Sequence, residues 1–135
     1  MEIVYQSKYL TLAVETSKQF IKVLWSASTE NMTDEEFRAE LIKYAEVSEQ
    51  YQPQKSLVDT QHFLMPIVPE TQEWVNDHIH QRSLKAGIKK FAYLVSKDLF
   101  SQVSIEQTME EGNAKEIFDT RYFENESEAM GWLDQ

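Results

Sequence analysis

The fold is decided by the stretch YLTLAVETSKQFIKVLW, residues 9–25. In its first half Leu10, Leu12 and Val14 alternate with other residues, and its second half is rich in β-branched and aromatic side chains, so both halves are predicted to be β-strands. Residues 15–18 form a short polar connection between them, which favours an antiparallel pair. A further strand is expected at residues 3–6. The N-terminal part of the chain therefore predicts an antiparallel meander.

Helix signals begin at residue 33. Thr33 and Glu36 fit a capping box, in which each side chain satisfies a backbone N–H group at the start of a helix, and Pro53 bars that helix from continuing. Pro69 is tolerated as a first helical residue, and Gly87 favours the left-handed conformation that ends a helix. The sequence therefore predicts one helix after residue 33 and a second between residues 69 and 87.

More strands and helices are expected between and after these two. A third helix is expected from Asp98 to about Glu111, Asn125 caps a short last helix, and strands are expected at residues 56–59, 88–95 and 116–123. Strand–helix–strand units imply parallel neighbours joined by right-handed connections. We therefore expect one α/β domain spanning residues 1–135, with element order β-β-β-α-β-α-β-α-β-α, a mixed β-sheet and helices packed on the sheet.

The composition is that of a folded, acidic protein. The chain has 135 residues, of which 41% are hydrophobic, and a net charge of −10, which argues against sequence-independent nucleic-acid binding because such binding needs a basic surface. The absence of cysteine excludes disulfides, Cys-ligated zinc and thiol catalysis. No run approaches the ~18 apolar residues of a membrane span, and no signal peptide is visible. We therefore expect a cytoplasmic protein that does not span a membrane.

Motifs for catalysis and for metal binding are missing from the sequence. It contains no Gly-x-Ser-x-Gly elbow, no Walker loop and no dinucleotide fingerprint. His78 and His80 are two residues apart on a predicted helix, about 200° around its axis, so they cannot share a metal ion. His78, beside Trp74 and Ile79, is interpreted as a packed residue of the inner helix face. The sequence therefore predicts no enzyme, no metal site and no cofactor.

Polar side chains gather where two parallel strands are expected to end, which is where ligands usually bind in open α/β sheets. Asp59, Thr60 and Lys97 are together similar to the carboxylate, hydroxyl and ammonium of a phospho-accepting receiver site, but the acidic pair that holds Mg²⁺ there is missing. The other interpretation is that Asp59 and Thr60 satisfy the loop backbone. The candidate ligand or partner surface comprises Asp59, Thr60, His62, Phe63, Met65, Thr71 and Lys97.

An apolar loop follows the same strand. Phe63, Leu64, Met65 and Ile67 lie in a segment expected to be irregular, and loops usually run over the protein surface. Such a cluster covers either a small pocket or a surface for a partner. In a chain of this length, we expect any pocket to be small.

Four strings, together with the order of elements, carry a resemblance to a known family. They are Ser56-Leu-Val-Asp-Thr60, Pro69-Glu-Thr-Gln-Glu-Trp74, Gly87-Ile-Lys-Lys-Phe-Ala92 and Arg121-Tyr-Phe-Glu-Asn-Glu-Ser-Glu-Ala-Met-Gly-Trp-Leu133. With them the chain resembles the SpoIIAA-like group of STAS domains, which has small bacterial members. STAS domains include anti-sigma-factor antagonists and the cytoplasmic tails of sulfate transporters. The resemblance implies a non-catalytic regulatory or protein-interaction module. The group is also similar in shape to CRAL-TRIO lipid-binding domains.

Signalling STAS domains carry an Asp-Ser-(Ser/Thr)-Gly turn at the start of the second helix, where a partner kinase phosphorylates a serine. The corresponding segment here is about Pro66-Ile-Val-Pro-Glu-Thr71, which has neither serine nor glycine. Thr71 is the one nearby hydroxyl, and it is either a phosphorylation site or, as we expect, a solvent-facing residue of the first helical turn. A phosphoserine switch is therefore not expected.

The sequence thus leaves three functional hypotheses. The first is a STAS-like interaction module that docks on another protein, or on a second copy of itself, through residues 63–68 and the second helix. The alternative is a binder of a small apolar or amphipathic ligand, as the similarity to lipid-binding domains implies. The third, less favoured, is an enzyme that uses Asp59, Lys97 or His62.

Overall fold

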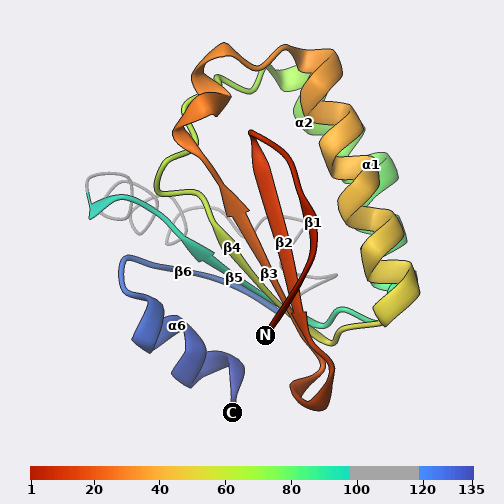
Figure 1. Cartoon of the computed structure of the whole chain (residues 1–135), viewed down its shortest axis with the longest axis vertical. Coiled ribbons are helices and arrows are strands. Elements are labelled where there is room, and N and C mark those ends of the chain that lie inside the picture. The colour runs from red at the N-terminus through yellow and green to blue at the C-terminus, as the bar shows by residue number, and fades with distance from the viewer. Residues whose placement is uncertain (98–118) are drawn as a thin grey trace.

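The computed structural model describes residues 1–97 and 119–135, which form a β-sheet with helices on both faces (Figure 1). The strands are β1 (Glu2–Gln6), β2 (Leu10–Glu15), β3 (Phe20–Trp25), β4 (Lys55–Asp59), β5 (Lys90–Leu94) and β6 (Asp119–Phe123). The helices are α1 (Asp34–Tyr51), α2 (Pro69–Trp74), α3 (His80–Ala86) and α6 (Glu126–Leu133), and a π-helical turn, η3 (Val75–Ile79), joins α2 to α3. Short 3-10 turns, η1 (Thr16–Lys18) and η2 (Ala27–Asn31), flank β3. The helix expected over 98–111 lies outside the described residues.

The described strands follow one another across the sheet in the order β1-β2-β3-β4-β5-β6. The first three pair antiparallel, whereas β3 with β4, β4 with β5, and β5 with β6 pair in parallel. The predictions of an α/β fold, of a mixed sheet and of an antiparallel start are therefore confirmed. Since β4 and β5 are parallel neighbours, their carboxyl ends lie at the same edge of the sheet.

The local signals in the sequence mark the helix ends correctly. Thr33 Oγ1 accepts a hydrogen bond from the Glu36 backbone N–H at 3.1 Å, and Glu36 Oε1 accepts one from the Thr33 N–H at 3.0 Å, which completes the capping box. Gly87 ends α3 with a φ of 109°, a conformation that favours glycine. Asn125 Oδ1 caps α6 by accepting the N–H of Glu128 at 3.2 Å. These helix starts and this helix end are confirmed as predicted.

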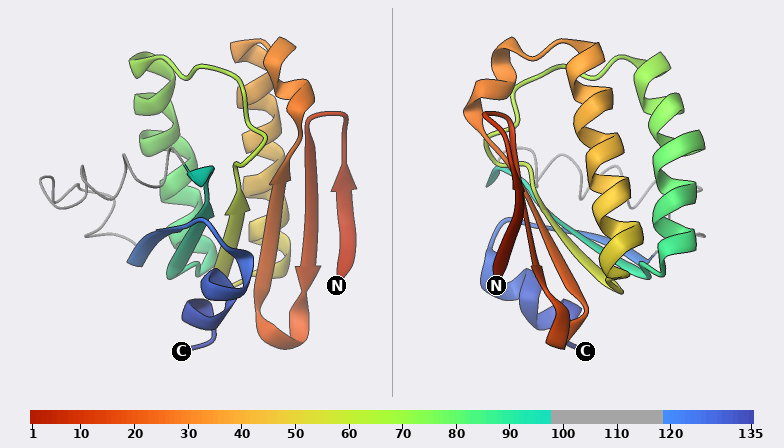
Figure 2. Two further views of the ribbon diagram at one scale, coloured as in Figure 1. Left: turned by 90° about the vertical axis from the view of Figure 1, so that its left-hand side faces the viewer. Right: turned by 45° about the vertical axis from the view of Figure 1, so that its right-hand side comes forward.

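The sheet separates two layers of side chains, because successive residues of a strand point to opposite faces. On β5, Phe91 and Tyr93 face α1 and the helical segment α2–η3–α3, here called the 69–86 helix, whereas Ala92 and Leu94 face α6. Figure 2 shows the sheet lying between α6 on one side and α1 with the 69–86 helix on the other. The same alternation on β3 and β4 gives the protein two separate apolar cores.

A lysine from the sheet holds α6 on its face. Lys90 Nζ donates hydrogen bonds to the backbone carbonyls of Trp132, at 3.3 Å, and Gln135, at 3.2 Å. Positive charge is favourable at the C-terminal end of a helix, where carbonyl groups lack partners within the helix. The buried residues Ala129, Trp132 and Leu133 pack α6 against this face of the sheet. The opposite face contains the cavity described next.

Candidate ligand-binding cavity

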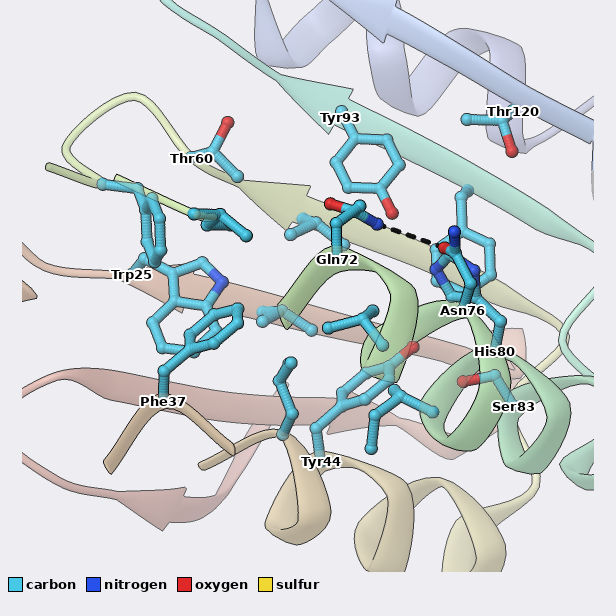
Figure 3. Close-up of a pocket in the computed structure, with 18 of the residues that line it drawn as sticks. Trp25, Phe37, Tyr44, Thr60, Gln72, Asn76, His80, Ser83, Tyr93 and Thr120 are labelled. Carbon is cyan, nitrogen blue, oxygen red and sulfur yellow. Dashed lines mark hydrogen bonds between the residues drawn. The ribbon is translucent and has the colours of Figure 1, made fainter. Parts of the chain in front are cut away.

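A cavity of about 940 Å³ lies between the sheet and the 69–86 helix (Figure 3). Its described walls come from β3, β4, β5 and β6, from α1 and from the 69–86 helix. Ligand-binding pockets commonly measure about 300–1,000 Å³. The expectation of a small pocket, drawn from the length of the chain, is therefore wrong. Among the described helices, α6 packs on the second face, while α1 and the 69–86 helix flank the cavity on the first.

Three aromatic side chains form one end of the cavity. The ring centroids of Trp25 and Phe37 are 5.6 Å apart, those of Trp25 and Phe63 are 5.2 Å apart, and those of Phe37 and Phe63 are 5.7 Å apart. Trp25 ends β3, Phe37 lies on the first turns of α1, and Phe63 belongs to the loop after β4. Such mutual contacts stabilise beyond the buried area alone. The cluster therefore fixes the start of the loop against the sheet.

A second set of aromatic side chains lies on the sheet itself. Phe91 and Tyr93 stack with ring centroids 6.1 Å apart and ring planes at 17°, and Tyr93 stacks on Tyr122 at 5.3 Å and 22°. The strand geometry explains both contacts, because Phe91 and Tyr93 share a face of β5 and Tyr93 is the register partner of Tyr122 on β6. Burial raises the pKa of Tyr93, so its phenol is uncharged at neutral pH. The three rings therefore form a stacked aromatic row on this face of the sheet.

The helix opposite this wall supplies polar groups. Gln72 Nε2 donates a hydrogen bond to Asn76 Oδ1 at 3.1 Å, and the half-buried His80 lies one turn further on, with its ring 6.4 Å from that of Phe91 (Figure 3). Burial lowers the pKa of His80 below its usual value, which makes its imidazole neutral at pH 7. We call Gln72, Asn76 and His80 the polar edge of the cavity. The polar edge consists of uncharged groups at neutral pH.

The π-helical turn decides which histidine faces the cavity. His80 lines it, whereas His78 is exposed and lies against Trp74, with ring centroids 5.6 Å apart. The interpretation of His78 as a residue of the inner face is therefore wrong. It assumed a regular α-helix, but a π-helical turn takes more residues per turn and shifts every later side chain around the axis.

Buried hydroxyl groups lie behind the cavity, between α1, α3 and β4. The hydroxyls of Tyr44 and Ser56 are 3.4 Å apart, and those of Ser48 and Ser83 are fully buried without a hydrogen-bond partner in the described part of the chain. Burial raises the pKa of Tyr44, against the opposing effect of the nearby serine hydroxyls. Tyr44 and Ser83 also line the cavity, so its inner end is uncharged as well.

Charged side chains are sparse among the described residues that line the cavity. Among its described lining residues the carboxylates are Glu73 and Asp77, both exposed at the rim, and neither lysine nor arginine occurs. In residues 1–97 and 119–135, no three His, Asp or Glu side chains are placed to hold a metal ion. The described walls thus offer aromatic surface and neutral hydrogen-bonding groups.

The structure brings two of the expected site residues to the cavity. Thr60 and Phe63 line it, and Met65 packs half-buried against the same core. Asp59 is buried and its Oδ1 accepts the Gln61 N–H at 3.1 Å, while Thr60 Oγ1 donates to the carbonyl of Leu94 at 2.7 Å. Both side chains therefore bond to backbone groups, as the second interpretation expects.

The remaining expected residues do not line the cavity. His62 and Lys97 are exposed, and neither belongs to its described wall. Thr71 is 1% exposed, and its hydroxyl donates to the carboxylate of Asp34 at the start of α1. The expectation that Thr71 faces solvent is therefore wrong, because the first turns of α1 and α2 meet there and cover it.

Several lining residues were not identified from the sequence, chiefly Tyr93, Tyr122, Asn76 and His80. The alternation of Phe91 and Tyr93 along their strand, with the aromatic pair in Arg121-Tyr-Phe123, is the signal that could have indicated an aromatic wall. No comparable signal marks the polar edge, because its position depends on the π-helical turn.

Comparisons of the chain with protein-family models, with curated proteins and with solved structures found no match. The described helices include none with both the length and the apolar character needed to cross a bilayer. Function is therefore inferred from the cavity and from the surface of the described residues.

Proposed function

We propose that this protein is a ligand-binding domain, which holds a small amphipathic molecule between the sheet and the 69–86 helix. The observation that carries the proposal is the cavity of about 940 Å³ with aromatic walls and a polar edge. Protein interiors are close-packed and contain few voids larger than a water molecule. This cavity is partly open to solvent, and an apolar ligand that enters it makes dispersion contacts with its lining atoms.

Binding of the uncharged dye Nile red, followed by its fluorescence, tests the proposal. Val75 is half-buried and lines the cavity, so Val75→Trp should fill the space and weaken binding at least tenfold. Leu84→Trp is the matched control, because Leu84 is 43% exposed on the same helix and lies outside the described wall. Gln72→Trp obstructs the cavity from its rim and serves if Val75→Trp does not fold.

The proposal is supported if the dye binds saturably at one site and only the obstructing variants lose it. It is overturned if the natural protein binds no dye saturably, or if Leu84→Trp weakens binding as much as Val75→Trp. An experimental structure in which the protein's own side chains fill the cavity would also overturn it. Native mass spectrometry of protein taken directly from cells would identify a ligand that is retained during purification.

The second candidate function is a STAS-like protein-interaction module acting in the cytoplasm. The observation that favours it is the loop after β4, where Leu64, Ile67 and Val68 are 52%, 39% and 52% exposed. Large apolar side chains that gather at the surface are typical of protein contacts. The meander followed by parallel strand–helix units also supports the resemblance to the SpoIIAA-like group.

A second copy of the chain is the partner to test first for this loop. Sedimentation velocity should then detect a dimer that the double change Leu64→Ser with Val68→Ser converts to monomer. A natural protein that stays monomeric up to about 100 μM would contradict self-association through the loop. The third hypothesis, an enzyme acting through Asp59, Lys97 or His62, stays the least favoured of the three.

A further inference from the structure

We propose that the ligand of the cavity carries an oxygen, that of an alcohol, a phenol or a ketone, which bonds to the hydroxyls of Ser83 and Tyr44 at the inner end. This inference rests on the proposed function and adds the subsite that recognises the polar group of the ligand. It is carried by the hydroxyl of Ser83, which is fully buried, has no partner within the described residues and lines the cavity.

Four hydroxyl groups gather where α3 packs on α1 and β4. Tyr44 and Ser48 are four residues apart on α1 and therefore share a face of that helix, while Ser83 lies on α3 and Ser56 on β4. All four residues are at most 4% exposed. Burial raises the pKa of Tyr44, and the three serine hydroxyls lie near enough to oppose that rise. We call these four groups the hydroxyl cluster.

Two members of the hydroxyl cluster, Ser48 and Ser83, make no hydrogen bond within the described part of the chain. A buried hydroxyl without a partner is unfavourable, because it has lost its hydrogen bonds to water and gained none in exchange. Native proteins satisfy most of their buried polar groups, so these two hydroxyls indicate a partner that the described residues do not supply. Ser83 differs from Ser48 in lining the cavity, where a ligand can reach it.

The hydroxyl of Ser83 is directed toward that of Tyr44, and both residues line the cavity (Figure 3). The contact of Tyr44 with Ser56, at 3.4 Å, is longer than the usual distance between two hydroxyl oxygens, about 2.7–2.8 Å. A ligand oxygen at this place can accept a hydrogen bond from Ser83, and a ligand hydroxyl can also donate one. The two side chains therefore form a subsite for one oxygen.

The polar edge is the weaker candidate for the same group. Gln72 Nε2 already donates to Asn76 Oδ1 at 3.1 Å, and both side chains are exposed, so water competes with a ligand for them. The hydroxyl of Ser83 is shielded from water, and a hydrogen bond is stronger in such surroundings. A ligand oxygen therefore gains more at Ser83 than at the polar edge.

Aliphatic neighbours of the two hydroxyls accommodate the apolar part of the ligand. Leu41 lies three residues before Tyr44 on α1, and Ile79 lies four residues before Ser83, so each is on the same helix face as the hydroxyl that follows it. Both also line the cavity. Burial of apolar surface against them is favourable and leaves the hydroxyls to the oxygen. The subsite thus suits an amphipathic molecule.

Displacement of Nile red by two probes with the same apolar body tests the inference at pH 7. The probes are 4-propylphenol, which carries a hydroxyl, and propylbenzene, which does not, and the ratio of their affinities measures the contribution of that hydroxyl. Ser83→Ala should lower the ratio about three- to tenfold, the effect of one lost hydrogen bond, and leave propylbenzene binding unchanged. Ser48→Ala is the matched control, because Ser48 is equally buried and unpartnered but lies outside the described wall.

Tyr44→Phe should also lower the ratio, and it takes the place of Ser83→Ala if that variant does not fold, which circular dichroism would detect. An unchanged ratio in the variant used, or an equal decrease in Ser48→Ala, overturns the inference. A crystal structure with 4-propylphenol should place the phenol oxygen within hydrogen-bond distance of Ser83 Oγ. A structure in which a water molecule bonds to Ser83 and the phenol oxygen lies elsewhere overturns the inference as well.

The same displacement experiment separates failure of the subsite from failure of the proposed function. If Nile red binds saturably but 4-propylphenol does not displace it, the subsite is wrong while the proposed function stands. If Nile red does not bind, the proposed function fails and the subsite fails with it.

Discussion

The buried hydroxyl of Thr71 donates a hydrogen bond to the carboxylate of Asp34, and this contact joins the first turns of two helices that are far apart in the chain. Asp34 Oδ2 also lies 2.9 Å from Arg38 Nε, one turn further along α1. The carboxylate thus links its own helix to α2. Thr71 is therefore a structural residue in this fold, and its hydroxyl is covered by the protein.

Replacing Thr71 by valine should lower the free energy of unfolding by about 1–2 kcal/mol, because the side chain keeps its volume but loses its hydrogen bond. Urea unfolding measures this change. Thr16→Val is the control, since Thr16 lies exposed in the turn before β3. An unchanged stability in Thr71→Val would contradict the contribution of the contact with Asp34.

Tyr5 should stabilise the meander through Glu40 of α1. Glu40 is only 9% exposed, and its Oε1 accepts a hydrogen bond from the Tyr5 hydroxyl at 2.7 Å. Tyr5→Phe should therefore cost about 1–2 kcal/mol at pH 7, as expected for a hydrogen bond to a charged acceptor. Tyr51→Phe should cost less, since no hydrogen bond to the Tyr51 hydroxyl occurs within the described part of the chain. Equal losses in chemical unfolding would contradict this prediction.

Acid should destabilise the protein partly through His80. Its pKa is lowered by burial in the folded protein, so the unfolded chain binds the proton more readily. Stability is therefore lost as the pH falls below about 6.5, with a slope of at most about 1.4 kcal/mol per pH unit. Unfolding measured between pH 7.5 and 5.5 should show a shallower dependence in His80→Gln than in His78→Gln. The same slope in both variants would exclude this role of His80.

The π-helical turn should tolerate the loss of one residue. Deleting the exposed Asp77 shortens the turn toward a regular α-helix, so the segments before and after it keep their inner faces. Deleting Gln81 in α3 instead rotates the following turn by about 100°. The Asp77 deletion should therefore lower the melting temperature less than the Gln81 deletion. Equal effects would indicate that the turn does not accommodate an additional residue.

Local signals account for the parts of the fold that could be predicted. A capping box, a glycine that ends a helix and the alternation of apolar residues each depend on a few neighbours in the chain, and Thr33, Gly87 and Leu12 illustrate the three cases. The parallel order of the later strands follows from the helices that the sequence predicts between them. The mixed sheet was therefore predictable without knowledge of the packing.

The cavity and its polar edge depend on contacts between distant segments. Thr71 is buried only because the start of α1 lies beside it, and Tyr93 reaches Tyr122 only through the register of β5 with β6. His80 faces the cavity only because a π-helical turn precedes it. A prediction from periodicity assumes one helical repeat throughout the segment, so it places His78 rather than His80 on the inner face of the helix.

The alternation along β5 places residues of the two cores next to one another in a single strand. Ala92 and Leu94 pack under α6, while Phe91 and Tyr93, their immediate neighbours, form the wall of the cavity. Under the proposed function, substitutions at the half-buried Tyr93 change the lining of the cavity while the core under α6 keeps its packing, whereas Phe91 is buried in the core of its own face. A library that varies the half-buried Tyr93 and Tyr122 and keeps Phe91 is therefore a practical starting point for turning this small scaffold into a sensor for a chosen small molecule.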